Sequence, residues 1–315
     1  MTHPMGRVGV LYGGKSAERE VSIMSGTGVH AALVSQGVDA HLFDTGVRSL
    51  GELADAKFDR VFISLHGRFG EDGTIQGALE LLGIPYTGSG PMASSLAMDK
   101  IMTKRIWIEA GLPTPGYAAL HDAQCVKSAV ERLGLPLMMK PPHEGSTLGV
   151  VKAVRAEDVL GAYQHAAQYD DVVLAEQFIS GRELTIAILG GGDSARALPL
   201  IEIVAPDGNY DYQNKYFSDD TRYLCPAPIE PALAAHIAQI SVQAYRALGC
   251  EGWGRADVIL DAAGKAWLIE MNTSPGMTGH SLVPMAAKAV GMDYPSLCMH
   301  ILSEARCKVG RLKQE

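Results

Sequence analysis

The sequence predicts an α/β fold of more than one domain. Its first ninety or so residues alternate apolar strands with helices, and glycine-rich polar loops follow at 13–16, 65–73 and 88–90. Residues 252–272 contain two apolar runs around a turn, which predicts a β-hairpin. A chain of 315 residues with 47% hydrophobic content is long enough for two or three domains with sizeable cores.

Charge and cysteine content exclude several classes of protein. Lys and Arg (27) against Asp and Glu (35) give a net charge of −8 without long runs of either sign, so nothing indicates a nucleic-acid groove. The apolar runs are far shorter than a membrane span, and the first is one strand long, unlike a signal peptide. The five cysteines are scattered and lack CxxC spacing, which indicates reduced thiols and not a zinc site or a disulfide framework. We therefore expect a cytoplasmic protein that binds neither nucleic acid nor a membrane.

The chain begins with a strand, a glycine turn and a helix. The strand is expected at 7–12 and the helix from about 17–20, and the turn between them has neither G-x-G-x-x-G nor P-loop spacing. The turn places Glu18 near the carboxyl end of a strand, where open α/β sheets bind ligands. An acid in a first helical turn also stabilises the helix dipole, so the sequence leaves both roles open for Glu18.

A helix is expected at 27–36, and two more strands are expected after it at 40–43 and 60–64. The second strand ends in loop 65–73, which places His66 at the edge of the predicted cleft. An isolated loop histidine is commonly structural, whereas its position at a cleft favours a functional role, and both interpretations stay open. Further helices are expected at 74–82, 94–110, 156–168 and 231–248, and further strands at 135–140 and 172–177.

Two loops have the composition of covers over a ligand. The strand ending in Lys140 leads into loop 141–151, which we call the flap. Its glycines, hydroxyls and N–H groups can wrap triphosphate oxygens. Segment 207–222 is long, polar and dotted with aromatic residues, which is typical of a functional lid. Between them, the edge 176–179 offers backbone groups and an aromatic ring to an adenine.

The predicted hairpin carries the clearest chemistry. A turn centred on 261–264 pairs Arg255 with Glu270 and Asp257 with Leu268. One face is expected to hold the apolar side chains of Ala256, Val258, Leu260, Trp267, Ile269 and Met271. The other is expected to hold Arg255, Asp257, Glu270 and Asn272, with Ile259, Ala266 and Leu268 between them. Oxygen ligands of this kind favour Mg²⁺, and the alternative is a surface hairpin with one cross-strand ion pair.

The motifs resemble those of the D-alanine–D-alanine ligases, a family of the ATP-grasp superfamily, across essentially the whole chain. The motifs are GGKSAEREVS (13–22), LHGRFGEDGTIQG (65–77), YTGSG (86–90), MDK (98–100), KPPHEGSTLGV (140–150), YDYQNKYFSDDT (210–221), GWGRADV (252–258) and EMNTSPGMTGHSLVP (270–284). Small departures from the family pattern are Thr147-Leu148 in the flap, Gln177-Phe178 near the expected adenine site, and Met271.

The resemblance implies a fold and a reaction. The fold is an N-terminal Rossmann-like domain (1–98) followed by a two-part ATP-grasp fold, with a central subdomain (99–183) and a C-terminal subdomain (184–315) clasping ATP. The reaction is the ATP-dependent joining of two D-alanine molecules through D-alanyl phosphate, for the bacterial cell wall. The implied cofactors are ATP and two Mg²⁺ or Mn²⁺ ions, and a homodimer through the N-terminal domain is what the family suggests.

The resemblance also implies roles for residues at the nucleotide. Lys100 and Lys140 hold phosphates, and Lys215 reaches toward the γ-phosphate. The expected adenine and ribose contacts are Glu176, Phe178, Ile179 and Glu183. The expected metal ligands are Asp257, Glu270 and Asn272, of which Asn272 also belongs to the nucleotide site.

For the amino acids, the resemblance implies that Glu18 receives the ammonium of the first D-alanine and that His66 faces it. Ser146 and Tyr216 link to Glu18 and close the lid. The oxyanion site is formed by Arg255 and the backbone N–H of Gly276, and Ser281 binds the carboxylate of the second D-alanine. Tyr216 accompanies dipeptide rather than depsipeptide synthesis in the family.

Three alternatives remain at this point. The chain could be another ATP-grasp carboxylate–amine ligase or a D-lactate ligase. It could be a binding module without catalysis, although each metal ligand and Arg255 is present. A nicotinamide dehydrogenase fits only the first domain, and the missing G-x-G-x-x-G counts against it.

Overall fold

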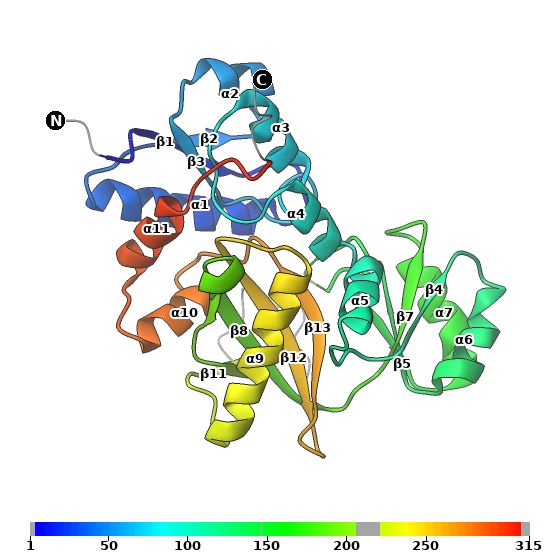
Figure 1. The fold of residues 1–315 in the computed structure, drawn as a ribbon. Helices are drawn as coiled ribbons and strands as arrows, with labels where there is room; N and C mark the ends of the chain where they lie inside the picture. Colours follow the sequence, from blue (N-terminus) through cyan, green and yellow to red (C-terminus); the bar gives the residue numbers. More distant parts are fainter. Residues whose placement is uncertain (1–3, 146, 206–220, 310–315) are drawn as a thin grey trace, which may run out of the picture.

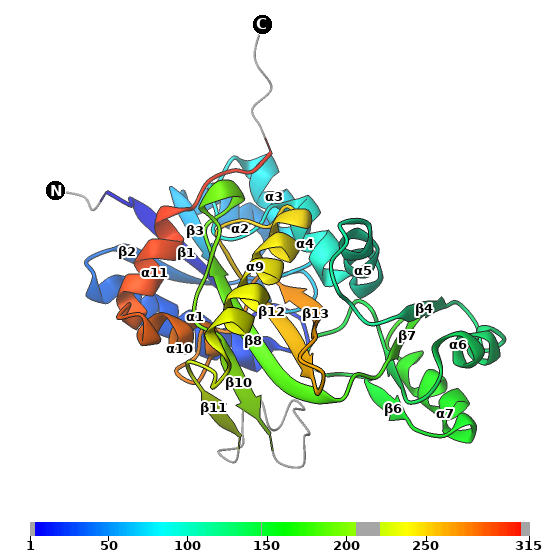
Figure 2. The same ribbon diagram turned by 60° about the horizontal axis from the view of Figure 1, so that its bottom comes forward.

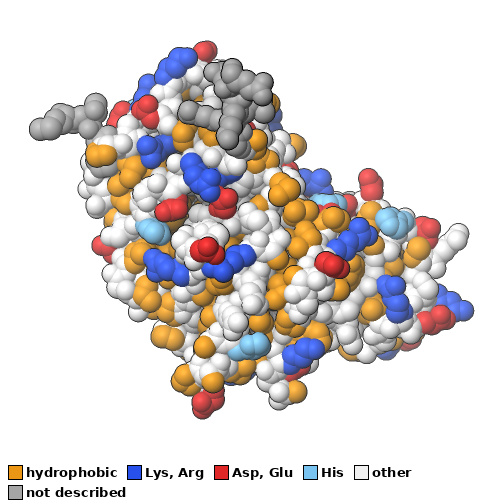
Figure 3. Space-filling view, in the orientation of Figure 1, with side chains coloured by type: hydrophobic (Ala, Val, Ile, Leu, Met, Phe, Trp, Pro, Cys, Tyr) orange, Lys and Arg blue, Asp and Glu red, His pale blue; other side chains and the backbone are white. Residues whose placement is uncertain are grey.

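The computed structural model describes residues 4–145, 147–205 and 221–309. Its architecture is three β-sheets with helices packed against them (Figures 1 and 2), so the predicted α/β class is confirmed. No helix among the described residues is long and apolar enough to cross a membrane. On the face drawn in Figure 3, basic and acidic side chains are interspersed with hydrophobic ones.

The N-terminal sheet is parallel and has the strand order β2-β1-β3. Its strands are β1 (Arg7–Tyr12), β2 (Asp39–Asp44) and β3 (Arg60–Ile63), and the helices around it are α1 (Arg19–Ser35), α2 (Leu50–Asp55), α3 (Thr74–Leu82) and α4 (Pro91–Met98). The two helical segments predicted between the first strands form the single helix α1. Tyr86 forms isolated bridges with Val61 of β3 and with Arg306 near the end of the described chain.

The helix predicted over 94–110 is interrupted, because Asp99 leaves the helical conformation between α4 and α5 (Lys100–Glu109). Its backbone is extended, and its carboxylate accepts hydrogen bonds from the N–H groups of Ile101 (2.9 Å) and Met102 (3.0 Å). This is the geometry of an N-cap, so Asp99 starts a new helix with Lys100 in its first turn.

The central sheet is antiparallel and has the order β4-β7-β5-β6. Its elements are β4 (Tyr117–Leu120), α6 (Cys125–Leu133), β5 (Leu137–Lys140), β6 (Val151–Ala153), α7 (Ala156–Ala166) and β7 (Val173–Gln177). The predicted flap is the connection between β5 and β6. Apolar side chains of this sheet and its two helices form a hydrophobic cluster of their own.

The C-terminal sheet has a main path of β11-β10-β8-β12-β13, and β9 pairs with β8. Its elements are β8 (Gly181–Leu189), the short helix η1 (Gly192–Ser194), β9 (Arg196–Ala197), β10 (Ile201–Val204), β11 (Arg222–Leu224), α9 (Pro231–Ala247), β12 (Trp253–Asp261) and β13 (Ala266–Asn272). The chain then forms α10 (Leu282–Ala289) and α11 (Tyr294–Ser303), and α11 packs against α1 of the N-terminal region. Residues of both regions therefore share one hydrophobic cluster, which contains Val8, Val29, Leu189, Trp253 and Leu297.

The hairpin β12–β13 is present, but its predicted register is wrong. Asp257 pairs with Glu270 and Arg255 with Asn272, and the register shifts between Asp257 and Val258. The cause is an odd turn, in which the Asp261 N–H bonds the Lys265 carbonyl at 3.0 Å, together with that β-bulge.

The corrected register moves four side chains to the opposite face. Ala266 and Leu268 are buried in the core, whereas Trp267 and Ile269 are partly exposed on the side expected to be polar. Ile269 lines the same cavity as Asp257 and Glu270. The expected gathering of both carboxylates on one face is nevertheless confirmed, because the two now face each other directly.

Candidate active site

Two cavities lie against the hairpin and join each other. The first, of about 130 Å³, is lined by Glu18, Arg255, Asn272, Gly276 and Ser281 among others. The second, of about 230 Å³, is lined by residues of the central and C-terminal sheets that include Lys140, Glu176, Phe178, Ile179, Glu183 and Asp257. Lys100, Gly145 and Glu270 line both cavities, so these three residues mark where the cavities meet.

Cations face both carboxylates of the hairpin. The Arg255 guanidinium donates to the two oxygens of Asp257 at 2.9 and 2.7 Å. The ammonium of Lys100 lies 3.5 Å from Glu270 and donates to the carbonyl of Glu144 at 2.7 Å. Two carboxylates directly opposite on neighbouring strands repel each other, and the cations from β12 and α5 reduce that repulsion.

The carboxylates and Asn272 form a donor set that fits a hard divalent cation. Asp257 and Glu270 are partly exposed (21% and 30% for the side chains) toward the second cavity. The Asn272 amide oxygen accepts from the Ser274 N–H at 3.1 Å and keeps a second lone pair. Within the described part of the chain, no group of three His, Cys, Asp or Glu side chains is arranged to hold a metal. An oxygen-only set with two acids fits Mg²⁺, which completes its octahedron with water and phosphate oxygens.

The side chain of Thr185 orients Asp257 from the neighbouring strand. Its hydroxyl lies 2.7 Å from Oδ1 of Asp257, and Thr185 is buried on β8. Together with Arg255, this contact fixes the carboxylate plane of Asp257.

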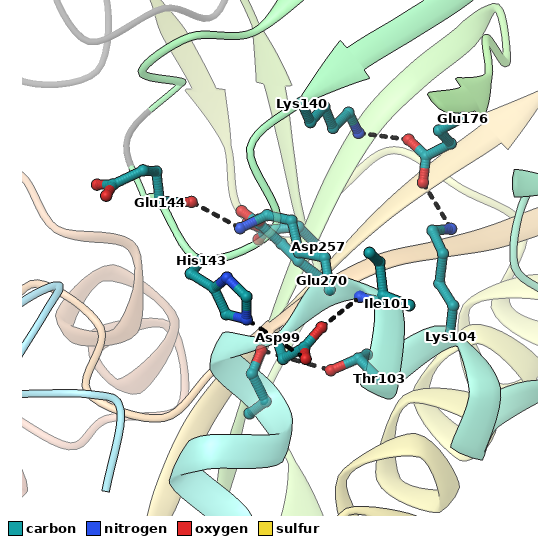
Figure 4. Close-up of polar contacts among 12 residues, drawn as sticks. Asp99, Ile101, Thr103, Lys104, Lys140, His143, Glu144, Glu176, Asp257 and Glu270 are labelled. Atoms are coloured by element: carbon teal, nitrogen blue, oxygen red, sulfur yellow. Dashed lines mark hydrogen bonds and ion pairs between the residues drawn. The ribbon is translucent and has the colours of Figure 1, made fainter. Parts of the chain in front are cut away.

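A buried ion network forms the wall of the second cavity (Figure 4). One oxygen of Glu176 contacts the ammonium of Lys140, and the other lies 2.5 Å from the ammonium of Lys104. Burial alone would raise the pKa of Glu176, but the two lysines outweigh it and hold that pKa below its ordinary value. Burial lowers the pKa of Lys104, and Glu176 opposes that change.

Phe178, Ile179 and Glu183, the other residues expected at the adenosine, line the same cavity. The Phe178 ring is covered on one side by the ammonium of Lys152, which lies 3.4 Å from the ring centroid. A nucleobase can thus stack only on the part of this ring that Lys152 leaves exposed.

In the wall of the first cavity, the Glu18 carboxylate is buried between two backbone segments. A Cβ atom on either Gly67 or Gly145 would lie 2.8 Å from Oε2 of Glu18, so a side chain at either position would displace this carboxylate. Gly67 also has a φ of +66°, which favours glycine. The loop 65–73 and the flap therefore close around the same carboxylate.

His66 lies behind this cavity and not in its wall. Its Nδ1 is 2.8 Å from the carbonyl of Ser274, and its Nε2 is 3.1 Å from the hydroxyl of Ser25. Glu71, which the sequence analysis did not single out, lines the cavity and lies 3.7 Å from the His66 ring. Burial lowers the pKa of His66, but the nearby carboxylate of Glu71 outweighs this and raises that pKa above its ordinary value.

Gly276 and Ser281 lie at the start of α10. The Ser281 hydroxyl accepts from the Thr278 N–H at 2.8 Å and shares a 2.9 Å contact with the Thr278 hydroxyl. This loop places both residues on the wall that Arg255 also lines. Ser146, Lys215 and Tyr216, and most of the predicted lid 207–222, lie outside the described residues, so their roles stay predictions.

The first residues of the flap are held by a histidine between two acids. His143 Nδ1 lies 2.8 Å from Asp170. On the other side of the ring, Nε2 lies 3.4 Å from Asp99 (Figure 4). Both acids raise the pKa of His143 above its ordinary value, and the contact with Asp99 has the larger effect. Beyond His143, Glu144 pairs with Arg68 of the N-terminal region at 2.7 Å.

Comparison with known proteins gives one consistent result. Residues 106–303 match the family model "D-ala D-ala ligase C-terminus", and residues 44–89 match "D-ala D-ala ligase N-terminus". D-alanine–D-alanine ligases of Bordetella petrii and Bordetella pertussis are each 67% identical; the alignments cover 97% and 98% of this chain and 94% and 98% of theirs. The crystal structure of the Bacillus anthracis D-alanine–D-alanine ligase complexed with ATP superimposes with a TM-score of 0.82 at 32% identity, over 95% of this chain and 96% of that one.

The pKa of His143 is expected to fall toward its ordinary value in the Asp170→Asn variant, because one of the two carboxylates that stabilise the imidazolium is removed. An NMR titration of the histidine ring measures this change. Asp171→Asn, at the exposed neighbouring position, is the matched control and leaves the titration unchanged. An unaltered pKa in Asp170→Asn would contradict the arrangement. Since the folded-state pKa is raised, the stability gained from this contact is complete below the ordinary histidine pKa and is lost as pH rises through the raised value.

Proposed function

This chain belongs to the D-alanine–D-alanine ligase family, and on that premise we propose that the two joined cavities are its active site. The family reaction is the ATP-dependent ligation of two D-alanine molecules through a D-alanyl phosphate, which supplies peptidoglycan precursors. The observation that supports the site is the meeting of the two cavities at Lys100, Gly145 and Glu270. A nucleotide in the second cavity and an amino acid in the first would have their reacting ends at this junction.

The first step joins the carboxylate of one D-alanine to the γ-phosphoryl group. A carboxylate oxygen bonds to γ-phosphorus as the β–γ bridging P–O bond breaks and ADP leaves. Lys100 and Lys140, whose ammonium groups lie at the junction and along the second cavity, hold the phosphates and counter the charge of the transferring group. Transfer of this kind depends on positioning and on charge stabilisation, which these fixed cations supply.

Glu18 holds the first D-alanine by its ammonium group. Its carboxylate is largely buried in the wall of the first cavity, beside Gly145, and a charged hydrogen bond to a cation is strong where little water competes. Behind it, the contacts of His66 with Ser25 and Ser274 fix the loop that carries Glu71. We therefore assign His66 to positioning this end of the site.

In the second step, the amine of the second D-alanine attacks the acyl carbon, and the C–O bond to phosphate then breaks. The negative charge that develops on the acyl oxygen is stabilised by Arg255 and the Gly276 N–H, which border the first cavity. Ser281, on the same wall, binds the carboxylate of the second D-alanine. A D-alanyl phosphate is readily hydrolysed, so the enclosed position of the junction excludes competing water.

At the other end, Glu176 and Glu183 bind the adenosine, and Phe178 and Ile179 cover the base. Asp257, Glu270 and Asn272 hold two Mg²⁺ or Mn²⁺ ions, in agreement with their oxygen donors and shared face. When bound, the ions neutralise charge on the phosphate oxygens.

The functional units are residues 1–98, 99–183 and 184–315, and the protein is a cytoplasmic homodimer. Large apolar side chains on two neighbouring helices of the N-terminal region support a subunit interface there. Leu81 of α3 is 93% exposed and Met92 of α4 is 71% exposed. Such side chains on adjacent elements are typical of a surface covered by a second copy.

Incubation with ATP, Mg²⁺ and D-alanine is expected to release phosphate and D-alanyl-D-alanine in equal amounts. The Arg255→Met variant is expected to lose about 10²–10³ in kcat, because one donor to the developing oxyanion is removed. Arg196→Met, which changes an exposed arginine of the same sheet, is the control. Failure of the unmodified protein to form dipeptide would exclude the proposed reaction, and full activity of Arg255→Met would exclude the role of Arg255.

Mn²⁺ binding in the presence of ADP is expected to weaken by at least tenfold in Asp257→Asn and in Glu270→Gln, since each variant removes a charged oxygen ligand. Electron paramagnetic resonance of free Mn²⁺ measures this without requiring catalysis. Glu131→Gln, on an exposed face of α6, serves as the control. Unchanged Mn²⁺ affinity in both site variants would place the ions elsewhere.

The mass in solution, measured by light scattering, is expected to be twice that of one chain. Leu81→Glu and Met92→Glu are each expected to give the single-chain mass, because a charge would be buried at the subunit interface. Leu160→Glu, which alters a half-exposed leucine of the central sheet's helix α7, leaves the mass unchanged. A single-chain mass for the unmodified protein would refute the homodimer.

A further inference from the structure

Lys104 is a fully buried lysine whose ammonium faces the nucleotide cavity wall from behind. It lies one helical turn after Lys100 on α5, and its side chain has no exposed surface. Its ammonium lies 2.5 Å from Glu176 Oε1 (Figure 4) and also donates to the Thr114 hydroxyl at 2.7 Å. Lys140 and Glu176 line the cavity, whereas Lys104 does not, so Lys104 can act on a bound nucleotide only through Glu176.

The arrangement is not explained by stability. Removing an ammonium and a carboxylate from water costs several kcal/mol per ion, and the attraction between them offsets that cost only with good geometry. Apolar residues of similar size at such positions are often neutral or stabilising. A third charge, that of Lys140, is needed at the same carboxylate, which is 2% exposed. The network therefore maintains a specific state of Glu176 at the cavity wall.

That state is the ionised carboxylate. Burial is the largest single influence on the pKa of Glu176 and favours the neutral form. Lys140 and Lys104 together favour the charged form more strongly, so the pKa is lowered. Lys140 borders the cavity and is assigned above to the phosphates, so its contact with Glu176 is shared with the substrate. Lys104 has no access to the cavity, and its pairing with Glu176 is independent of what the cavity holds.

We propose that Lys104 is a positioning residue that keeps Glu176 ionised and thereby sets the preference of this ligase for adenine over guanine nucleotides. The inference rests on the proposed contact of Glu176 with the base. An ionised carboxylate only accepts hydrogen bonds. It therefore binds the exocyclic amino group of adenine and repels the carbonyl oxygen that guanine carries at the same position. A neutral carboxyl group has a proton to donate and loses that discrimination.

The test is the Lys104→Met variant, which keeps the length of the side chain and removes its charge. The KM for ATP is expected to rise about tenfold or more with a smaller change in kcat, and the ratio of kcat/KM for ATP to that for GTP is expected to fall by a similar factor. Because loss of Lys104 raises the pKa of Glu176, the loss of selectivity is expected to be larger at pH 6 than at pH 8. Lys104→Arg, which retains the charge, is expected to restore most of the selectivity. Lys127→Met, at an 86% exposed lysine of α6, controls for the change in net charge.

A second set of variants, made with Glu176→Gln, distinguishes a failure of this inference from a failure of the proposed site. Glu176→Gln is expected to lower the ATP preference by itself, and adding Lys104→Met to it is expected to cause no further loss, because the carboxylate on which Lys104 acts is gone. If Glu176→Gln keeps full ATP preference, the proposed contact of Glu176 with the base is wrong. If Glu176→Gln loses it but Lys104→Met keeps it at both pH values, the inference about Lys104 is wrong. The thermal melting of each variant shows whether it folds. If Lys104→Met does not fold, the double variant and Lys104→Arg are compared instead. A further loss of ATP preference in the double variant, or no ATP preference in Lys104→Arg, would overturn the inference.

Discussion

The direct pairing of Asp257 with Glu270 across β12 and β13 is the constraint on which the rest of the site depends. Two carboxylates that face each other on adjacent strands repel, so the fold must bring cations to them. Arg255 comes from the same strand, and Lys100 comes from a helix that starts only because Asp99 caps it. Through Lys100 the hairpin is tied to the Glu144 carbonyl, and through Glu144 to Arg68 of the N-terminal region. The cations that offset the repulsion between these two carboxylates thus connect three parts of the chain.

Local sequence pattern was sufficient for β1 and α3, whose bounds agree with those predicted, and for the gathering of Arg255, Asp257, Glu270 and Asn272 on one face. It was insufficient where a single residue changes the register. The three-residue turn after Asp261 and the bulge beside Val258 moved Leu268 into the core and Ile269 out of it, and alternation alone cannot reveal an extra residue in one strand. Asp99 is a different case, because an aspartate between two helical segments is a recognisable N-cap. The prediction of one long helix over 94–110 overlooked this signal.

The buried charges were the hardest to anticipate. Lysine and glutamate are rarely fully buried, so nothing in the spacing of Lys104 and Glu176 distinguishes them from surface residues. The location of His66 behind the cavity likewise depends on contacts with Ser25 and Ser274, the second of them 208 residues away in the chain. Hydrogen bonds between segments so distant in sequence follow from the tertiary fold, which no local window contains. The family resemblance identified the reaction, and the geometry added how these residues are supported.

Gly145 has a consequence for inhibition. It borders both cavities, and a Cβ atom at this position would lie 2.8 Å from Glu18, so the backbone at the junction runs close to this carboxylate. On the proposed assignment of the site, a single compound with a cationic head for Glu18 and an anionic centre beside Lys100 spans the junction and competes with both substrates at once. Escape by mutation at Gly145 is constrained, because a side chain there would have to displace the carboxylate that we propose holds the first D-alanine.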